Sequence, residues 1–129
     1  MTGVLLPAAL PAASGWSLVD NLTDAKVTGP AIAGTATADF GQLPDNELWL
    51  IDHAVVFCDS AAATTVRWYA GDTIPSRLLD GSDSGNFDVG DWPAGLLIRP
   101  SQNLLVQWSG ADDLAVGTVT IQYRLLRRT

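Results

Sequence analysis

The feature that most constrains the fold is an alternation of apolar and polar residues near the end of the chain. Within the run GTVTIQYRLL, every second position is apolar: Val119, Ile121, Tyr123 and Leu125. A period of two marks a β-strand with one buried and one solvated face. A similar run, NLLVQWS, precedes it, and an acidic turn at residues 110–117 joins the two. The sequence therefore predicts a closing β-hairpin, which is typical of a β-sandwich.

Further strands are predicted along most of the chain, and no segment shows a convincing helical period. Turn residues recur at the short spacing of all-β sandwiches and barrels, which gives seven to nine strands. We therefore predict an all-β fold, a single antiparallel, jelly-roll-like β-sandwich. The segments interpreted as strands or strand-like are 16–22, 26–40, 47–58, 65–70, 77–79, 95–99, 104–109 and 118–125.

The beginning of the chain is interpreted as an extended arm. Pro7 and Pro11 lie four residues apart and disfavour a regular helix. We place the arm at residues 1–31 and the sandwich domain at residues 32–129. The arm holds apolar side chains that give it a reason to be tied down, either on its own domain or on another chain: Val4, Leu5, Leu6 and Leu10.

Composition narrows the classes of partner. Seven basic and fourteen acidic residues give a net charge of −7, which disfavours binding to nucleic acid or to an anionic membrane. No apolar run approaches the roughly 20 residues that span a bilayer. Hydrophobic residues make up 47% of the chain and charged residues only 16%. Because a soluble monomer normally carries more charge, part of the apolar surplus is expected to face a partner.

The basic residues crowd near the C-terminus, at Arg124, Arg127 and Arg128. Such a cluster is either a solvated tail or a charged contact with a neighbouring subunit. Together with the arm, it is our candidate for a subunit contact.

Residues of catalytic type are few. His53 is the only histidine and no GxSxG elbow is present, so a serine triad is not indicated. Cys58 is the only cysteine, and in a regular strand its side chain and that of His53 point to opposite faces. The five tryptophans are interpreted as core or interface anchors rather than as a sugar platform. We predict no catalytic residues and no cofactor, and a protein that is not an enzyme.

The segment from Asp80 to Asp91 partly matches a calcium loop. Oxygen-bearing side chains occupy positions one, three, five, nine and twelve, with glycine at six. However, the twelfth position is Asp91 where a longer glutamate is usual, and Pro75 and Pro93 bracket the loop where helices would flank it. We interpret the segment as a solvated acidic turn and predict no metal site.

Four segments together resemble a family of viral proteins: ELWLIDHAVVFC, TVRWYAGD, LLIRPSQNLLVQWSGADD and GTVTIQYRLL. They resemble small β-sandwich structural proteins of tailed bacteriophages, and are most similar to capsid decoration (cement) or head-fibre-type proteins. The resemblance covers roughly residues 47–127. It implies a homotrimer or other homo-oligomer on the outer capsid surface of the virion, in contact with the major capsid protein. It brings no active-site residues.

Two functions are therefore expected from the sequence. The first is a capsid decoration protein that binds the major capsid protein and stabilises the shell. The alternative is a receptor- or carbohydrate-binding β-sandwich of a phage tail or fibre, which tryptophans exposed near Trp92 would favour.

Overall fold

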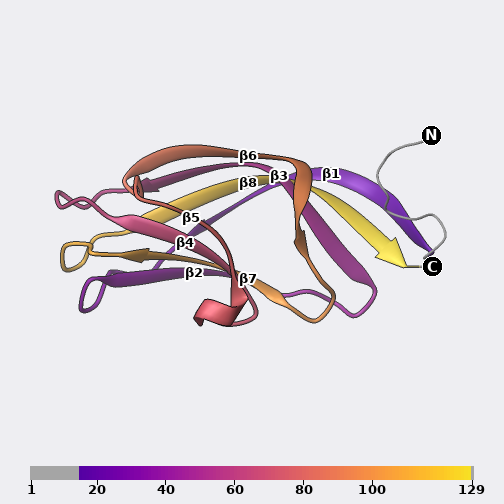
Figure 1. Ribbon diagram of the computed structural model, residues 1–129, viewed down its shortest axis with the longest axis horizontal. Helices are drawn as coiled ribbons and strands as arrows, with labels where there is room; N and C mark the ends of the chain where they lie inside the picture. Colours follow the sequence, from indigo (N-terminus) through magenta and orange to yellow (C-terminus); the bar gives the residue numbers. More distant parts are fainter. Residues whose placement is uncertain (1–14, 129) are drawn as a thin grey trace.

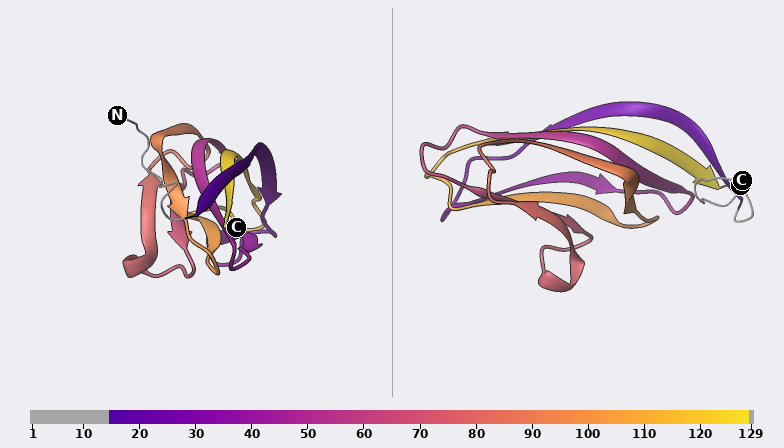
Figure 2. Two further views of the ribbon diagram at one scale, coloured as in Figure 1. Left: turned by 90° about the vertical axis from the view of Figure 1, so that its right-hand side faces the viewer. Right: turned by 45° about the horizontal axis from the view of Figure 1, so that its top comes forward.

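The structure is a computed structural model that describes residues 15–128. It contains eight strands and one short 3-10 helix within this range. The strands are β1 (Trp16–Val27), β2 (Thr35–Gln42), β3 (Glu47–Cys58), β4 (Thr65–Ala70), β5 (Leu78–Ser82), β6 (Phe87–Ile98), β7 (Asn103–Ser109) and β8 (Gly117–Arg128). The helix η2 (Pro75–Arg77) lies between β4 and β5, in a segment that projects away from the sandwich (Figure 2).

The strands form two four-stranded antiparallel sheets that lie one above the other (Figure 1). The first sheet has the order β1-β8-β3-β6 and the second the order β2-β7-β4-β5. In this arrangement β1 pairs with β8, β2 with β7, β3 with β6 and β4 with β5. The chain is thus one long hairpin rolled into two layers, which is the topology of an eight-stranded jelly roll. The predicted fold class is confirmed.

The core fills the space between the two sheets. Alternate residues of each strand point inward, as the period of two requires. In β8, Val119 and Ile121 are fully buried and Tyr123 is nearly so, which confirms the buried face predicted for this strand. The predicted closing hairpin is wrong: β7 pairs with β2 and β4, whereas β8 pairs with β1 and β3, so the turn between them connects the two sheets. Other fully buried side chains come from both sheets: Ile51, Ile98, Val66, Leu104, Val106 and Trp108.

Trp108 is the largest of these buried side chains, and its ring is fixed on two sides. Its Nε1 donates a hydrogen bond to the backbone oxygen of Gly85 at 2.8 Å. On another side, a Cβ placed on Gly117 would lie 2.6–2.8 Å from three atoms of the indole ring. Glycine is therefore required at position 117 by the packing of the indole.

Tyr123 and Trp49 close one end of the core. Their rings are 4.2 Å apart between centroids. Burial of the phenol raises the pKa of Tyr123, and the nearby charges of Asp24 and Glu47 raise it further. The phenol is thereby held in its neutral form, which suits an aromatic contact beneath the first sheet.

The structure places two boundaries differently from the sequence prediction. Residues 16–27 form β1, which pairs with β8 and belongs to the sandwich, so the arm predicted at residues 1–31 is too long. Residues 16–22 were predicted as a strand but assigned to the arm rather than to the sandwich. The polar residues of β1, Asp20, Asp24 and Lys26, suit an edge strand because charge discourages pairing with another chain. The part of the arm before Gly15 lies outside the described residues.

The second difference concerns Asp80–Asp91, predicted as a long loop. The structure shows two edge strands joined by a turn, with β5 ending at Ser82 and β6 beginning at Phe87. The two strands belong to different sheets, where β4 supplies hydrogen-bond partners for β5 and β3 supplies them for β6. Pairing at the sheet edges therefore overrides the low strand propensity of its glycine, serine and aspartate residues.

Candidate interaction surfaces

The outer face of the first sheet carries an unusual number of apolar side chains at one end. The strand register aligns Phe87, Phe57, Thr118 and Val27 in one row across the sheet, and Val89, Val55, Thr120 and Ala25 in the next. These eight positions, which we call the apolar face, contain no charged residue. Four of them are prominently exposed, at 50% for Phe57, 63% for Phe87, 47% for Val89 and 63% for Val27.

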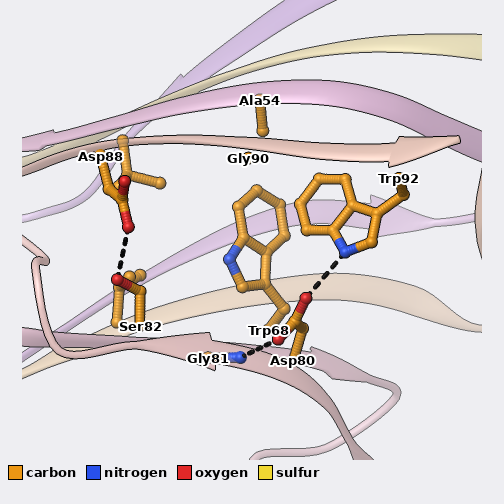
Figure 3. Close-up of a pocket in the computed structure, with 10 residues that line it drawn as sticks. Ala54, Trp68, Asp80, Gly81, Ser82, Asp88, Gly90 and Trp92 are labelled. Atoms are coloured by element: carbon orange, nitrogen blue, oxygen red, sulfur yellow. Dashed lines mark hydrogen bonds between the residues drawn. The ribbon is translucent and has the colours of Figure 1, made fainter.

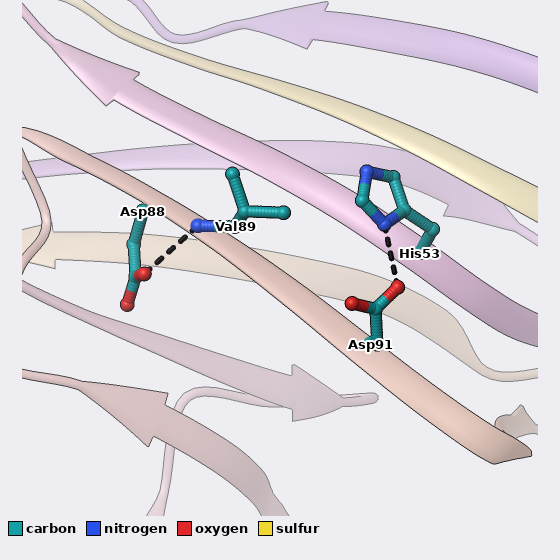
Figure 4. A network of polar contacts seen from close by, with 4 residues as sticks. All are labelled: His53, Asp88, Val89 and Asp91. Atoms are coloured by element: carbon teal, nitrogen blue, oxygen red, sulfur yellow. Dashed lines mark hydrogen bonds and ion pairs between the residues drawn. The ribbon is translucent and has the colours of Figure 1, made fainter.

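A polar band borders the apolar face on the same side of the sheet. The next row contains His53 on β3 and Asp91 on β6, whose Nδ1 and Oδ1 atoms are 2.7 Å apart (Figure 4). Beyond it, Arg124 makes a bidentate contact with Asp52, at 3.0 Å from Nε and 2.7 Å from Nη2. Asp52 lies at a bulge in β3, between Ile51 and His53. Each carboxylate in this band, Asp91 and Asp52, thus has a side-chain partner.

The three arginines predicted as a contact cluster each interact within the chain. Arg124 pairs with Asp52 as described, and Arg127 Nη2 lies 2.8 Å from Glu47 Oε2. The Arg128 guanidinium lies over the Trp16 ring at 4.6 Å from its centroid. These partners orient the arginines along the end of β8, and their contact with another subunit stays a prediction.

A small apolar cluster lies next to these arginines. Leu48, Leu50 and Leu126 are buried, and Trp16 and Leu97 pack against them. The register places Leu48 opposite Leu126 and Leu50 opposite Arg124, on the side of the sheet away from the main core. The other predicted contact residues, Val4, Leu5, Leu6 and Leu10, lie outside the described residues.

A cavity of about 100 Å³ opens between the sheets, where β5 and β6 form their edges (Figure 3). The ring of Trp68 meets that of Trp92 edge to face, with 5.1 Å between centroids. Trp92 Nε1 donates a hydrogen bond to Asp80 Oδ2 at 2.8 Å. These contacts tie the two edge strands together across the opening.

A second polar contact closes the same edge. Ser82 Oγ donates a hydrogen bond to Asp88 Oδ2 at 2.5 Å, and the backbone N–H of Val89 donates to the other carboxylate oxygen at 2.8 Å. The hydrogen bond from Ser82 lowers the pKa of Asp88, and that from Val89 lowers it further. Asp88 therefore acts as an ionised acceptor that holds β5 against β6.

The positions that match a calcium loop do not gather around one point. Asp80 and Ser82 lie on β5 and are engaged with Trp92 and Asp88 at the cavity, whereas Asp91 faces the other side of β6 and contacts His53. Among residues 15–128, no group of three or more histidine, cysteine, aspartate or glutamate side chains is placed to hold a metal ion.

The remaining residues of chemical interest occupy structural positions. Cys58 is buried in the core, while the His53 side chain is about one-third exposed on the opposite face, as the strand spacing predicted. Trp108 and Trp68 are buried, in line with their interpretation as core anchors. Within the part of the chain that the structure describes, no helix is long and apolar enough to cross a membrane.

The apolar face was not predicted from the sequence, although a signal for it exists. In residues 47–58, apolar side chains occur at both odd and even positions. A strand of this kind is typical of a sheet that is covered on both faces. The alternation of β8 and the continuous apolar character of β3 together indicate that part of the outer face is apolar.

Comparison with solved structures identifies proteins of similar fold. A chain from the acidic stable capsid structure of Helicobacter pylori bacteriophage KHP30 matches with a TM-score of 0.50 and 10% identity, covering 84% of this chain and 92% of that one. PliG, a periplasmic inhibitor of g-type lysozyme from Aeromonas hydrophila, matches with a TM-score of 0.39 and 10% identity, covering 89% and 92%. The second likeness is too weak to support an inference. No protein-family model matches the chain, and no curated protein matches it.

Proposed function

We propose that this protein is a structural component of a phage virion, and specifically a capsid decoration protein that binds the outer surface of the major capsid protein. The observation that carries the proposal is the jelly roll, which is shared with a phage capsid chain over nearly the whole length of both. Jelly rolls recur in viral capsid proteins. The structural likeness supports the fold directly. The proposed function rests on this likeness together with the apolar face of the first sheet.

The surface chemistry suits a protein that works by contact. An uncharged, exposed sheet face on a chain with a net charge of −7 is expected to be covered by a partner. The two-layer sandwich holds that face on strands rather than on loops, so little conformational entropy is lost on docking. Decoration would stabilise a shell by burying surface across capsomers. A role without catalysis is part of the proposal.

The alternative is a carbohydrate- or receptor-binding role on a tail or fibre. The candidate binding site for such a ligand is the cavity between β5 and β6. Its lining includes residue types that bind sugars: Trp68, Trp92, Asp80 and Asp88. However, the cavity of about 100 Å³ is small beside the ~300–1,000 Å³ of typical ligand pockets. Trp68 is also buried, and Trp92 is bonded to Asp80 rather than presented as a stacking platform.

Labelling of intact particles separates the two roles. Antibodies raised against the purified protein would be applied to particles of the phage that encodes it, and gold labels located by electron microscopy. Labels distributed over the head are expected. Labels confined to the tail or fibres would favour the alternative, and the absence of the protein from purified particles would contradict both.

A second measurement tests the stabilising role directly. Capsids assembled without the protein should bind the added protein and then lose their integrity at a higher temperature. A control protein of similar size and charge should have no effect. Capsids that bind the protein without any gain in thermal or osmotic resistance would contradict a cement function while leaving a virion location intact.

A further inference from the structure

The apolar face is uncharged and spans all four strands of the first sheet. Its two rows run across all four strands of the first sheet, from Phe87 on β6 to Val27 on β1. The four prominently exposed side chains leave on the order of 400 Å² of apolar surface open to solvent. A stable dimer buries about 800 Å² on each partner. The apolar face supplies about half of this area, and the adjoining row, which contains His53 and Gln122, extends it.

The net charge of the protein decides which of its surfaces a second copy can approach. Two copies that each carry −7 repel one another over most of their surfaces. Contact through the apolar face limits this repulsion, because its eight positions carry no charge and the carboxylate of the adjoining row, Asp91, contacts His53. A second copy can therefore approach closely through this face.

The sizes of the side chains along the outermost row also match in a two-fold arrangement. The row runs Phe87, Phe57, Thr118, Val27. Two sheet faces pack about 10 Å apart with their strands roughly aligned. A two-fold axis parallel to the strands then sets β6 of one copy over β1 of the other, so that Phe87 opposes Val27 and Phe57 opposes Thr118. Each large side chain meets a smaller one.

We propose that a second copy of this chain docks on the apolar face, face to face and related by a two-fold axis along the strands. Phe57 and Phe87 are the anchors of this interface, and Val27 and Thr118 receive them. The dimer does not depend on the virion role, because it is a property of the isolated protein in solution. In a virion, it would join two sandwiches into one four-layered unit, and the contact with the capsid would then fall to other surfaces, namely the arm and the arginines at the end of β8.

The first test is the mass of the full-length chain in solution, measured by sedimentation over a range of concentrations. A dimer of about 27 kDa is expected, twice the 13.6 kDa of one chain. Phe87→Asp should raise the dissociation constant by at least about 30-fold, as for an interface hot spot. Ile74→Asp is the matched control: Ile74 is 43% exposed but lies next to η2, between β4 and β5 of the second sheet rather than on the first. It should leave the dimer unchanged.

A cross-linking test fixes the arrangement. Val89 and Ala25 lie three strand spacings apart within one chain, about 14 Å, and the two-fold axis sets Val89 of one copy opposite Ala25 of the other. Because the facing side chains point toward each other across sheets about 10 Å apart, a short bismaleimide can join Val89→Cys to Ala25→Cys between two copies but not within one chain. In a Cys58→Ala background, the double variant should form a covalent dimer with this cross-linker, and each single variant should not. Circular dichroism of every variant confirms that the fold is retained.

Three results would overturn the proposal. One is a full-length chain that stays monomeric or forms an odd-numbered oligomer. Another is a dimer that Phe87→Asp leaves intact, or a double cysteine variant that gives no covalent dimer. The third is a full-length chain that stays monomeric but forms a Phe87-dependent dimer once residues 1–14 are removed. In that case the arm, rather than a second copy, would cover the apolar face. Particle labelling is unaffected by any of these results, so the two proposals fail separately.

Discussion

Replacing Gly117 with alanine tests the packing that fixes the centre of the core. The added Cβ would lie 2.6–2.8 Å from three atoms of the Trp108 ring, closer than such contacts are ever found. Either the indole or the start of β8 must therefore move. The indole is fully buried, and its Nε1 is bonded to the backbone oxygen of Gly85, so a shift of the ring also strains that hydrogen bond.

The expected loss follows from these two contributions. Overpacking a core by one methyl group costs about 1–3 kcal/mol. Weakening a buried hydrogen bond adds about 1 kcal/mol. We therefore expect Gly117→Ala to lower the free energy of unfolding by about 2–4 kcal/mol. For a chain of this size, at roughly 4 °C per kcal/mol, the melting temperature should fall by about 8–16 °C.

Urea and thermal unfolding, followed by tryptophan fluorescence and circular dichroism, would measure the loss. Gly29→Ala is the matched control, because no atom lies within 4 Å of the added Cβ and the change is expected to stay within about 0.5 kcal/mol. In a double-mutant cycle with Trp108→Phe, the smaller ring should remove part of the penalty, which gives a coupling energy of about 1 kcal/mol or more. A Gly117→Ala protein as stable as the Gly29→Ala control would refute the argument.

Three further predictions concern the core, an edge contact and the arm. Ile121→Asp should unfold the domain, because an unpaired charge in a fully buried position costs several kcal/mol. Gln122→Asp, on the exposed side of the same strand, should be tolerated. An Ile121→Asp protein that melts like the wild type would show that the two faces of β8 are misassigned. Ionised Asp88 stabilises the fold because its pKa is lowered, so this contribution is present above about pH 4 and is lost as pH falls through the lowered pKa. Ser82→Ala removes the main cause of the lowered pKa of Asp88, so the melting temperature of this variant should fall less than that of the wild type between pH 5 and pH 2. If NMR titration shows that the pKa of Asp88 does not rise in the variant, the explanation is wrong. Removal of residues 1–14 should weaken capsid binding more than it lowers the melting temperature, and a truncated protein that coats capsids with unchanged affinity would rule out a clamp.

The sequence predicted the features that depend on a simple period. From Thr118 to Arg124 the alternation in β8 is regular, so the buried positions of Val119 and Ile121 follow from spacing alone. The same reasoning placed Cys58 and His53 on opposite faces of β3. Such predictions succeed because one face of each strand is buried against the core, whichever strands lie beside it.

Features that depend on contacts between distant segments were not predicted. The segment from β5 to β6 has the composition of a loop, and much of it forms strand because β4 and β3 supply its backbone hydrogen-bond partners in two different sheets. The exposed pairing of Phe57 with Phe87 likewise requires the register of two strands that lie about 30 residues apart. Local propensity does not contain this information, because it arises only when the sheet is assembled.

The pairing of the first strand with the last has a consequence for how the chain folds. β8 lies between β1 and β3, so the first sheet stays in two pieces until residues 117–128 are available. Closing loops of this length precedes any gain in packing, and proteins dominated by such non-local pairings fold in about milliseconds to seconds. Until β8 has been synthesised, the edges of β1 and β3 that pair with it stay unpaired and apolar residues stay exposed, which favours aggregation. The pairing of β8 with β1 and β3 is therefore expected to be the step that completes the first sheet.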